Sequence, residues 1–529
     1  MHHGPDRDLE REERPGVAKT EVLIVGAGPT GLVLALWLAK SGVALRIIDK
    51  TDAPGTTSRA ILFHARNLEF YHQLGIADVA VERGVQFAVV NLWKNGRHVG
   101  RVSLADIGAG ISPYPYILIL PQDQQEQLLI EQLDLLGVRV ERQTELVSLH
   151  QTPKGVSARL KARDGNEEII EAEYLAGCDG AHSFVRETIN VDFPGGAYDD
   201  LYYVADVEAE GPVTNGEMHG AIDDAEFLAI FPMKGQGRIR FVGQAGPDAR
   251  RGPELRWENE SGRAIERLKV TVKTVRWFST YHVGHRVAGA FRRGRVFLLG
   301  DAAHIHSPVG GQGMNTGIGD AVNLAWKLAA VLEGRAGAAI LDSYAVERRA
   351  FARTLVRTTD RAFKFVSARG PIAKWLRLTI VPRIVPRLFE FRATRALLFR
   401  TISQTSVRYP QSLLSSGKGR RIRGGDRLPW ITIGKPSDRA GDNFDPLVSR
   451  DWQAHVYGKI SLALRAFCES RGLPTHVFPW RSEMRGAGFQ QDATYLIRPD
   501  GYVGSACRAG NVAELERYLD RHQIRMTAK

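Results

Sequence analysis

Three stretches of the chain combine a short apolar run with a glycine-rich turn and a following helical pattern. The first, EVLIVGAGPTGLVLALWLAKSGVALRIIDK over residues 21–50, predicts a buried strand, a tight turn, a helix and a second strand that ends in Asp49. This order is typical of a dinucleotide-binding βαβ unit. In that unit Gly26 allows the turn, Gly28 lets the backbone approach a pyrophosphate, and Gly31 lets helix and strand pack closely.

The acid that ends the second strand narrows the choice of dinucleotide. Asp49 would accept hydrogen bonds from a ribose, and it would repel a 2′-phosphate at the same place. The free N–H groups at the start of the helix would face the phosphates. NAD and FAD both remain open on these residues.

The second stretch, YLAGCDGAHSFVRETI over residues 174–189, delivers Asp179 and Gly180 into a turn after a short apolar run. Asp-Gly turns are common, so this stretch alone predicts only a turn.

The third stretch, GRVFLLGDAAHIHSPVGGQGMNTGIGDAVNLAWKL, places Asp301 at the carboxyl end of a buried strand, where open α/β sheets bind ligands. The loop from Pro308 to Gly313 carries enough glycine for a flat ring to approach the backbone. A helix that begins near Met314 would point its N-terminus at that ring and stabilise negative charge on it.

Alternating patterns predict further strands on both sides of the third stretch. Segments between about Val191 and His285 alternate as strands of a second sheet. After Asp426 the pattern predicts a strand, a helix, a strand, a hairpin about Pro499-Asp500-Gly501 and a last helix capped by Asn511.

The formal net charge of +12 is concentrated between Arg353 and Arg400, where twelve Lys or Arg stand against two Asp or Glu. No zinc-finger, RNA-binding or leucine-zipper pattern accompanies this charge, so no nucleic-acid partner is expected. Two interpretations stay open for the segment: linking helices with solvated arginines, or a basic surface that meets acidic lipid or a partner.

The three cysteines form no CxxC and no metal-ligand pattern, which predicts a reducing, cytoplasmic setting and no bound metal. Residues 1–19 are charged and without an apolar core, and are expected to form a disordered tail rather than a signal peptide. The apolar run after Trp375 is broken by prolines and arginines, so no transmembrane segment is expected.

With these three motifs in this order, the chain resembles the group A FAD-dependent aromatic hydroxylases, the family of para-hydroxybenzoate hydroxylase and phenol hydroxylase. The resemblance runs from Glu21 to about Arg349, and the third motif matches almost end to end. It implies non-covalent FAD as the cofactor. The FAD contacts that it implies are Gly26, Gly28, Gly31, Asp49, Lys50, Arg59, Gln122, Asp179, Asp301, Gly313, Met314 and Asn315.

The resemblance also implies an α/β and α+β fold with a Rossmann-like FAD-binding domain and an inserted β-sheet substrate domain. The FAD-binding domain would be discontinuous, over residues 20–190 and 286–352, with the substrate domain over 191–285. A basic helical connection over 353–425 would lead to residues 426–529, which resemble the thioredoxin-like C-terminal domain of the phenol and polyketide hydroxylase branch. Without a CxxC this last domain is expected to be redox-inert.

The implied reaction is hydroxylation of a phenolic or polyketide-type aromatic compound with O₂, through a flavin C4a-hydroperoxide. NADPH or NADH would bind transiently, because the only dinucleotide fingerprint is used for FAD. By resemblance, the Pro308 carbonyl can face a substrate hydroxyl, and His64 stands where phenol hydroxylases carry an acid, which places simple phenol in doubt. The candidate bases are His64, Tyr114, Tyr116, Tyr203, His219 and His304.

Several alternatives remain at this point. The chain could be another FAD-dependent oxidoreductase, namely a reductase, an oxidase or an antibiotic-modifying monooxygenase, or a non-catalytic FAD-binding scaffold. A flavin halogenase is disfavoured because its WxWxIP motif is absent. A homodimer also stays open.

Overall fold

The structure is a computed structural model of the whole chain. It describes residues 18–55, 60–222, 227–245, 257, 262–308, 310–367, 370, 380–433, 441–508 and 510–526. Arg59 lies outside the described residues, as do residues 1–17 of the expected tail. Residues 18 and 19, which were assigned to that tail, instead begin the first strand.

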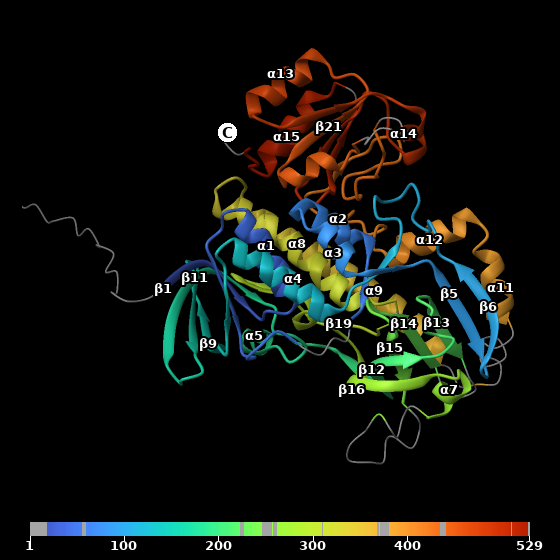
Figure 1. Cartoon of the computed structure of the whole chain (residues 1–529). Coiled ribbons are helices and arrows are strands. Elements are labelled where there is room, and N and C mark those ends of the chain that lie inside the picture. Colours follow the sequence, from blue (N-terminus) through green and yellow to red (C-terminus); the bar gives the residue numbers. More distant parts are fainter. Residues whose placement is uncertain are drawn as a thin grey trace, which may run out of the picture.

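A mostly parallel sheet forms the first layer and joins all three predicted motifs (Figure 1). Its strands, in spatial order, are β17 (Arg292–Arg293), β18 (Val296–Leu298), β11 (Glu167–Gly177), β1 (Ala18–Val25), β2 (Leu45–Asp49) and β8 (Val140–Arg142). An antiparallel extension consists of β10 (Val156–Lys161), which pairs with β11, and β9 (Glu145–Gln151), which pairs with β10.

Three helices pack against one another beside this sheet (Figure 1). They are α1 (Pro29–Lys40), α4 (Gln122–Leu135) and α8 (Gln312–Leu332). The run LVLALWL in α1 is buried on all sides, which its near-continuous apolar sequence requires. The predicted helix near Met314 is confirmed as α8, whose first residue is Gln312.

The second sheet has the spatial order β19-β16-β12-β15-β14-β13-β5-β6. Its members are β5 (Val89–Lys94), β6 (Arg97–Ser103), β12 (Gly195–Glu210), β13 (Met218–Ile222), β14 (Phe227–Pro232), β15 (Arg238–Gln244), β16 (Thr271–Val287) and β19 (His304–Ile305). The short helix α7 (Gly262–Arg267) lies between β15 and β16 in the sequence.

Two strands of this sheet come from a region expected to belong to the FAD-binding domain. β5 and β6 form a hairpin about Asn95-Gly96, both with positive φ, and β5 pairs in parallel with β13. The substrate sheet therefore draws on residues well before 191.

A smaller sheet and two helices connect the two large sheets. The three-stranded sheet has the order β3-β7-β4, and α2 (Ala65–Leu74) and α3 (Ala77–Arg83) follow β3. Its strands are β3 (Leu62–Phe63), β7 (Ile117–Ile119) and β4 (Val85–Phe87).

Beyond the second sheet, one helix crosses a predicted boundary. α9 (Asp342–Ser367) continues without a break past residue 352, where the FAD-binding domain was expected to end. Two further helices, α11 (Val381–Leu388) and α12 (Arg392–Ile402), follow it, with α11 near β6.

The C-terminal unit, residues 416–526, lies over α2 and α8 (Figure 1). Its sheet has the order β20-β24-β23-β21-β22. The strands are β20 (Ser416–Gly417), β21 (Gln453–Tyr457), β22 (Thr475–Phe478), β23 (Thr494–Ile497) and β24 (Val503–Cys507), and the helices are α13 (Leu462–Arg471), α14 (Ser482–Ala487) and α15 (Val512–Arg521). β21 and β22 are parallel and the β23–β24 hairpin is antiparallel, in the predicted sequence order.

In the part of the chain that the structure describes, no helix combines the length and the apolarity that a membrane crossing requires.

Candidate functional site

The turns of the three sequence motifs meet at one edge of the first sheet. β1, β11 and β18 are parallel neighbours, so the segments that follow their last residues lie side by side. The Cys178 N–H donates to the Val25 carbonyl at 2.7 Å, and the Leu299 N–H donates to the Gly177 carbonyl at 3.0 Å. This is the edge at which an open α/β sheet binds its ligand.

The turn after β1 requires glycine for close approach. Gly26 has φ +105°, and a Cβ there would lie 2.3 Å from the Cys178 carbonyl oxygen. A Cβ at Gly31 would lie 2.0 Å from the Gly26 oxygen, as its predicted packing role demands. A Cβ at Gly28 would meet no heavy atom within 4 Å, so this position faces open space.

The N-terminus of α1 faces the same open space. Gly28 is its N-cap, no side chain caps the helix, and its first turn carries no acid. Its free N–H groups and partial positive charge are therefore available to a phosphate.

Asp49, at the end of β2, accepts a backbone hydrogen bond from this turn. Its Oδ2 accepts from the Ala27 N–H at 2.7 Å, and its Oδ1 accepts from the N–H of Thr51 at 2.9 Å and from the Thr51 hydroxyl at 2.6 Å. Any ribose contact would share these oxygens. Lys50 is exposed beside it, and the Gln122 amide donates to the Glu126 carboxylate at 2.8 Å.

Asp179 ties its own turn together. It accepts from the Ser183 hydroxyl at 2.6 Å and from the Val185 N–H at 3.0 Å, at the start of α5 (Phe184–Thr188). Burial raises the pKa of the Asp179 carboxyl despite these bonds. Arg186 then donates to the Ala302 carbonyl at 3.0 Å, so the second motif supports the loop of the third.

Asp301 and the N-terminus of α8 complete the edge. Asp301 is exposed although Gly300 and Ala302 on either side are buried. α8 begins after Gly311 with no side-chain cap and no acid in its first turn. The segment from Asp301 to the start of α8 therefore offers two contacts. The Asp301 carboxylate can accept from the hydroxyl groups of a ligand, and the N-terminus of α8 can stabilise an anionic ring edge.

Beneath this loop is a buried charge network that the sequence analysis missed. The Asp320 carboxylate accepts from the Gly300 N–H at 3.0 Å, from His304 Nε2 at 2.7 Å and from Arg348 Nε at 2.6 Å. Burial opposes ionisation of Asp320, but Arg348 and His304 outweigh burial and lower the pKa of the carboxyl. The sequence signal was an acid within the otherwise apolar run GIGDAVNLAW.

His64 and Asn315 hold the glycine loop from the other side. Because a carbonyl can only accept, His64 Nε2 carries the proton that it donates to the Gly310 carbonyl at 2.9 Å. Burial lowers the pKa of His64 to about 4 despite this bond, so the ring is neutral near pH 7. The Asn315 side chain donates to the carbonyls of Leu62 and Gly311 at 2.8 and 2.7 Å, and accepts from the His64 N–H at 2.9 Å.

Three of the candidate bases already have structural contacts elsewhere. His304 belongs to the Asp320 network. His219 accepts from the Trp93 indole at 3.0 Å and contacts Asn215 Oδ1 at 2.8 Å. Tyr203 packs in the apolar cluster on the sheet face away from the first sheet. The hydroxyl of Tyr114 lies 3.3 Å from His72, and the rings of Tyr114 and Tyr116 contact each other.

The second sheet turns a mixed aromatic and charged face toward the motifs. Buried Arg240 pairs with Asp206 and donates to the Ala60 carbonyl at 3.3 Å, which sets the direction of this face. Trp277 and Tyr281 lie on the same face by strand alternation. Arg240 and Asp206 were missed by the sequence analysis, because their pairing joins two strands that are distant in sequence.

These features fit FAD. The open cradle at Gly28, the uncapped ends of α1 and α8, and exposed Asp301 match the pyrophosphate, the anionic ring edge and the hydroxyl-bearing chain of that cofactor. Pro308 is exposed on the same loop, after buried Ser307.

Comparisons with known proteins identify the family of the chain. A model of the family described as FAD binding domain matches residues 19–359. A 6-methylpretetramide 4-monooxygenase from Streptomyces rimosus is 37% identical over 75% of this chain and 72% of the relative. A rifampicin monooxygenase from Rhodococcus hoagii is 32% identical over 92% of this chain and 94% of the relative. The solved structure of an anhydrotetracycline hydroxylase from Streptomyces rimosus superimposes with a TM-score of 0.76 at 26% identity, over 96% of this chain and 100% of that one.

Proposed function

The chain belongs to the group A FAD-dependent aromatic hydroxylases, and on that premise we propose that it hydroxylates a polyketide-type or other bulky phenolic compound with NAD(P)H and O₂. The observation that carries the proposal is the meeting of three motif turns at one sheet edge, opposite an aromatic face of a second sheet. FAD, when bound, supplies the chemistry that activates O₂ and transfers one oxygen atom to an aromatic ring.

The residues of this chain divide the remaining tasks. We assign Gly28, the N-termini of α1 and α8, and Asp301 to holding FAD. Asp49, Asp179 and the Asn315 side chain support that site through the backbone contacts described above. His64 holds the Gly310 carbonyl, and with a pKa of about 4 it is a weak base, so we assign it to positioning the loop.

An aromatic wall supports a large, flat substrate. Tyr202, Tyr281 and Phe363 pack together, with ring centroids of Tyr202 at 6.0 Å from Tyr281 and 5.7 Å from Phe363. Phe363 lies one turn beyond Thr359 on α9. The Thr359 carbonyl accepts a hydrogen bond from the Ser307 hydroxyl at 3.3 Å. The wall is thus linked to the loop that carries Pro308, whose carbonyl we propose to face a substrate hydroxyl.

Labelled oxygen tests the reaction. With a correct substrate, ¹⁸O₂ should place one atom in the product and the other in water, and stopped-flow absorbance of oxidised flavin should fall much faster than without substrate. A panel of phenols and polyketide aromatics that yields only peroxide would reject hydroxylation in favour of a reductase or oxidase. Acid precipitation should release all the flavin, since the proposed binding is non-covalent.

A second candidate function is modification of an antibiotic. It is favoured by the rifampicin monooxygenase, which matches 92% of this chain, more than the 75% matched by the 6-methylpretetramide relative. Rifampicin therefore belongs in the same panel, and oxygenation of rifampicin with no activity on polyketide aromatics would select this candidate.

We also propose the domain division, with boundaries adjusted to the fold. The FAD-binding part would consist of both segments that carry the motifs, and the substrate part would include β5 and β6 as well as 191–285. The C-terminal unit would be a thioredoxin-like domain, supported by the order β24-β23-β21-β22 with one parallel and two antiparallel pairs. Burial raises the pKa of Cys507 to about 11 and also raises that of Cys468, which supports a redox-inert unit.

The setting and the oligomer are further proposals. All three cysteines are free thiols, which agrees with a reducing cytoplasm. A homodimer is tested by light scattering of the purified FAD-loaded protein.

A further inference from the structure

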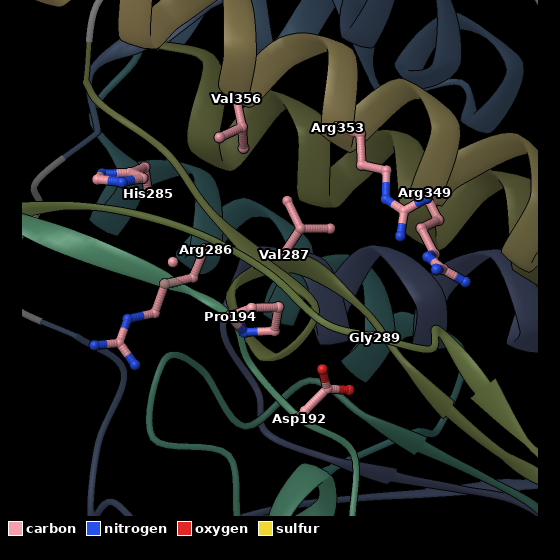
Figure 2. Close-up of a pocket in the computed structure, with 10 residues that line it drawn as sticks. Asp192, Pro194, His285, Arg286, Val287, Gly289, Arg349, Arg353 and Val356 are labelled. Carbon is pink, nitrogen blue, oxygen red and sulfur yellow. The ribbon is translucent and has the colours of Figure 1, made fainter.

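A cavity of about 460 Å³ opens where the chain crosses between the two large sheets (Figure 2). One wall is the segment that leads from α5 into β12, the second is the end of β16, and the third is α9. Its charged or imidazole-bearing residues are Asp192, His285, Arg286, Arg349 and Arg353. Its volume is within the range of small-molecule sites.

The charge of this cavity is not balanced. Three arginines and one carboxylate, that of Asp192, line the cavity, which leaves two positive charges. Among the described residues, Arg286, Arg349 and Arg353 form no ion pair, and buried Arg349 Nε has no hydrogen-bond partner. Buried Nδ1 of His285 also lacks a partner within that part of the chain.

The arginines lie in two groups. Figure 2 shows the Arg349 and Arg353 side chains extending together from α9, while Arg286 extends the opposite way from β16. The Arg286 guanidinium lies 5.9 Å from the centre of the Phe193 ring, and Arg186 lies 4.0 Å from the same ring. A ligand with negative charge at more than one position matches this spread better than a single small anion does.

Burial and like charge act together at Arg349. Burial lowers the pKa of its guanidinium, and the neighbouring charge of Arg353 lowers that pKa further, against the smaller opposing effect of Asp192. The two neighbouring guanidinium groups repel each other, and Asp192 offsets only part of this repulsion. Phosphate oxygens placed between them would remove the repulsion and would satisfy the free Nε–H.

One strand, β19, separates the cavity from the glycine loop that begins at Pro308. Arg286 pairs with Ile305 and Val287 with His304, so the wall of the cavity borders β19, which runs into the segment with Pro308. On α9, Val356 lines the cavity, and Thr359 accepts from Ser307 of that segment. A ligand anchored here is therefore beside the loop at which the ring of FAD is expected.

We propose that this cavity binds the phosphate groups of the pyridine dinucleotide that reduces the flavin. The proposal rests on the proposed function, which needs NAD(P)H, whereas the sequence has one dinucleotide fingerprint and FAD takes it. Arginines on two sides of an open cavity supply what a Rossmann turn would otherwise supply: donors and positive charge for several phosphate oxygens.

The test measures binding apart from turnover. The FAD-loaded protein is titrated by calorimetry with ADP-ribose and with its 2′-phosphate, which carry the phosphates but no nicotinamide. The variant Arg349→Gln/Arg353→Gln should weaken binding of the tighter analogue at least tenfold. Arg357→Gln is the matched control, because it removes an exposed charge from the same helix outside the cavity and should bind as the wild type does.

Two more measurements separate binding from folding. Arg349→Lys keeps the positive charge but loses the planar guanidinium group. If the fold is intact, its affinity for the analogue should lie between those of the wild type and the double variant. In stopped-flow reduction, the apparent dissociation constant of NAD(P)H should rise at least tenfold in the double variant, while the limiting rate constant and the flavin spectrum stay unchanged.

The outcomes are distinct from those of the hydroxylation test. The proposed site would be overturned if the wild type and the double variant bound the analogues with equal affinity. It would also be overturned if neither protein bound either analogue. Loss of aromatic substrate affinity, with unchanged analogue affinity, would also overturn it and assign the cavity to an acidic substrate. If no compound is hydroxylated but analogue binding still depends on Arg349 and Arg353, the site stands and the proposed function fails.

Discussion

Asp301 is an exposed carboxylate between two buried neighbours. Its flanking residues are buried in the strand end and in the α8 contact, yet its own side chain is exposed on the loop. A charge-assisted hydrogen bond contributes about 1.5–3 kcal/mol. We therefore expect Asp301→Ala to weaken FAD binding about ten- to a hundredfold, measured by fluorescence titration of apoprotein.

Asp301→Asn is the control for shape. It keeps an acceptor oxygen without the charge, so its FAD affinity should lie between those of wild type and Asp301→Ala. An unchanged FAD dissociation constant in Asp301→Ala would remove the residue from the site.

Buried histidines give the protein a defined response to acid. Burial lowers the pKa of His64, His219 and His306 to about 4 in each case. In the unfolded chain a histidine titrates near 6.5, so between pH 6.5 and 4 the unfolded state binds more protons than the folded state. The stability is therefore complete above pH 6.5 and is lost as the pH falls toward 4.

At pH 5 the loss amounts to about 2 kcal/mol for each fully neutral histidine. We expect urea midpoints to fall steeply between pH 6.5 and 5, and His64→Asn to show a shallower fall than wild type over the same range. Parallel profiles for the two proteins would show that His64 is protonated in the folded state.

At the scale of single residues, the sequence predicted the roles of the glycines better than the contacts of the polar side chains. The roles of Gly26 and Gly31 follow from the local turn alone, and the structure has the close contacts that they require. The partners of Asn315 could not be read from the sequence, because Leu62 and His64 lie about 250 positions earlier in the chain.

Among the elements, α8 carries the most connections of the site. Its first turn faces the glycine loop, and Asn315 within that turn makes three side-chain hydrogen bonds to β3 and α2, through Leu62, His64 at the N-cap of α2, and Asn67. A fourth bond holds Gly311 at the N-cap of α8. Asn315→Ala would leave buried polar groups without partners, at about 1–3 kcal/mol for each group that finds no water.

We expect Asn315→Ala to lower the unfolding free energy by about 2–4 kcal/mol and to weaken FAD binding, measured by urea unfolding and flavin titration. Asn166→Ala is the matched control, since that exposed side chain bonds only Asp164 within its own turn. Equal effects of the two substitutions would contradict the role assigned to Asn315.

Element types were predictable because the apolar periodicity is strong where burial is deep, as in α1 and β1. Membership of a sheet was not. The hairpin of β5 and β6 lies within the residues assigned to the FAD-binding domain, and the pairing of β5 with β13 places it in the second sheet. The helix α9 crosses residue 352, where the FAD-binding domain was expected to end, and Phe363 near its end packs against Tyr202 of the second sheet.

Across the whole molecule, the C-terminal unit is joined to the FAD-binding part by a buried ion network. Arg498, next to the hairpin turn after β23, bonds Glu347 of α9 at 2.7 Å and Asp500 at 2.6 Å. Lys327 of α8 bonds the same glutamate at 2.9 Å, and all four side chains are at most 1% exposed. Burial lowers the pKa of Lys327 to about 8 against the attraction of Glu347.

Removing one partner from such a network leaves the others as uncompensated buried charges, which costs about 3–5 kcal/mol. We expect Arg498→Met to lose about that much unfolding free energy, and Arg471→Met, whose pairs with Glu516 and Asp520 are half-exposed, to lose less than about 1 kcal/mol. Both are measured by urea unfolding of the FAD-loaded protein.

The same substitution also tests whether the C-terminal unit supports the flavin site. Glu347 and Lys327 anchor the helices α9 and α8, and α8 begins at the glycine loop. Arg498→Met should therefore raise the FAD dissociation constant as well. Adding Asp500→Asn should restore part of the lost stability, because Asp500 loses its ion pair in Arg498→Met whereas Glu347 keeps Lys327. If Arg498→Met destabilises the protein and FAD affinity stays that of Arg471→Met, the network joins the units without shaping the site.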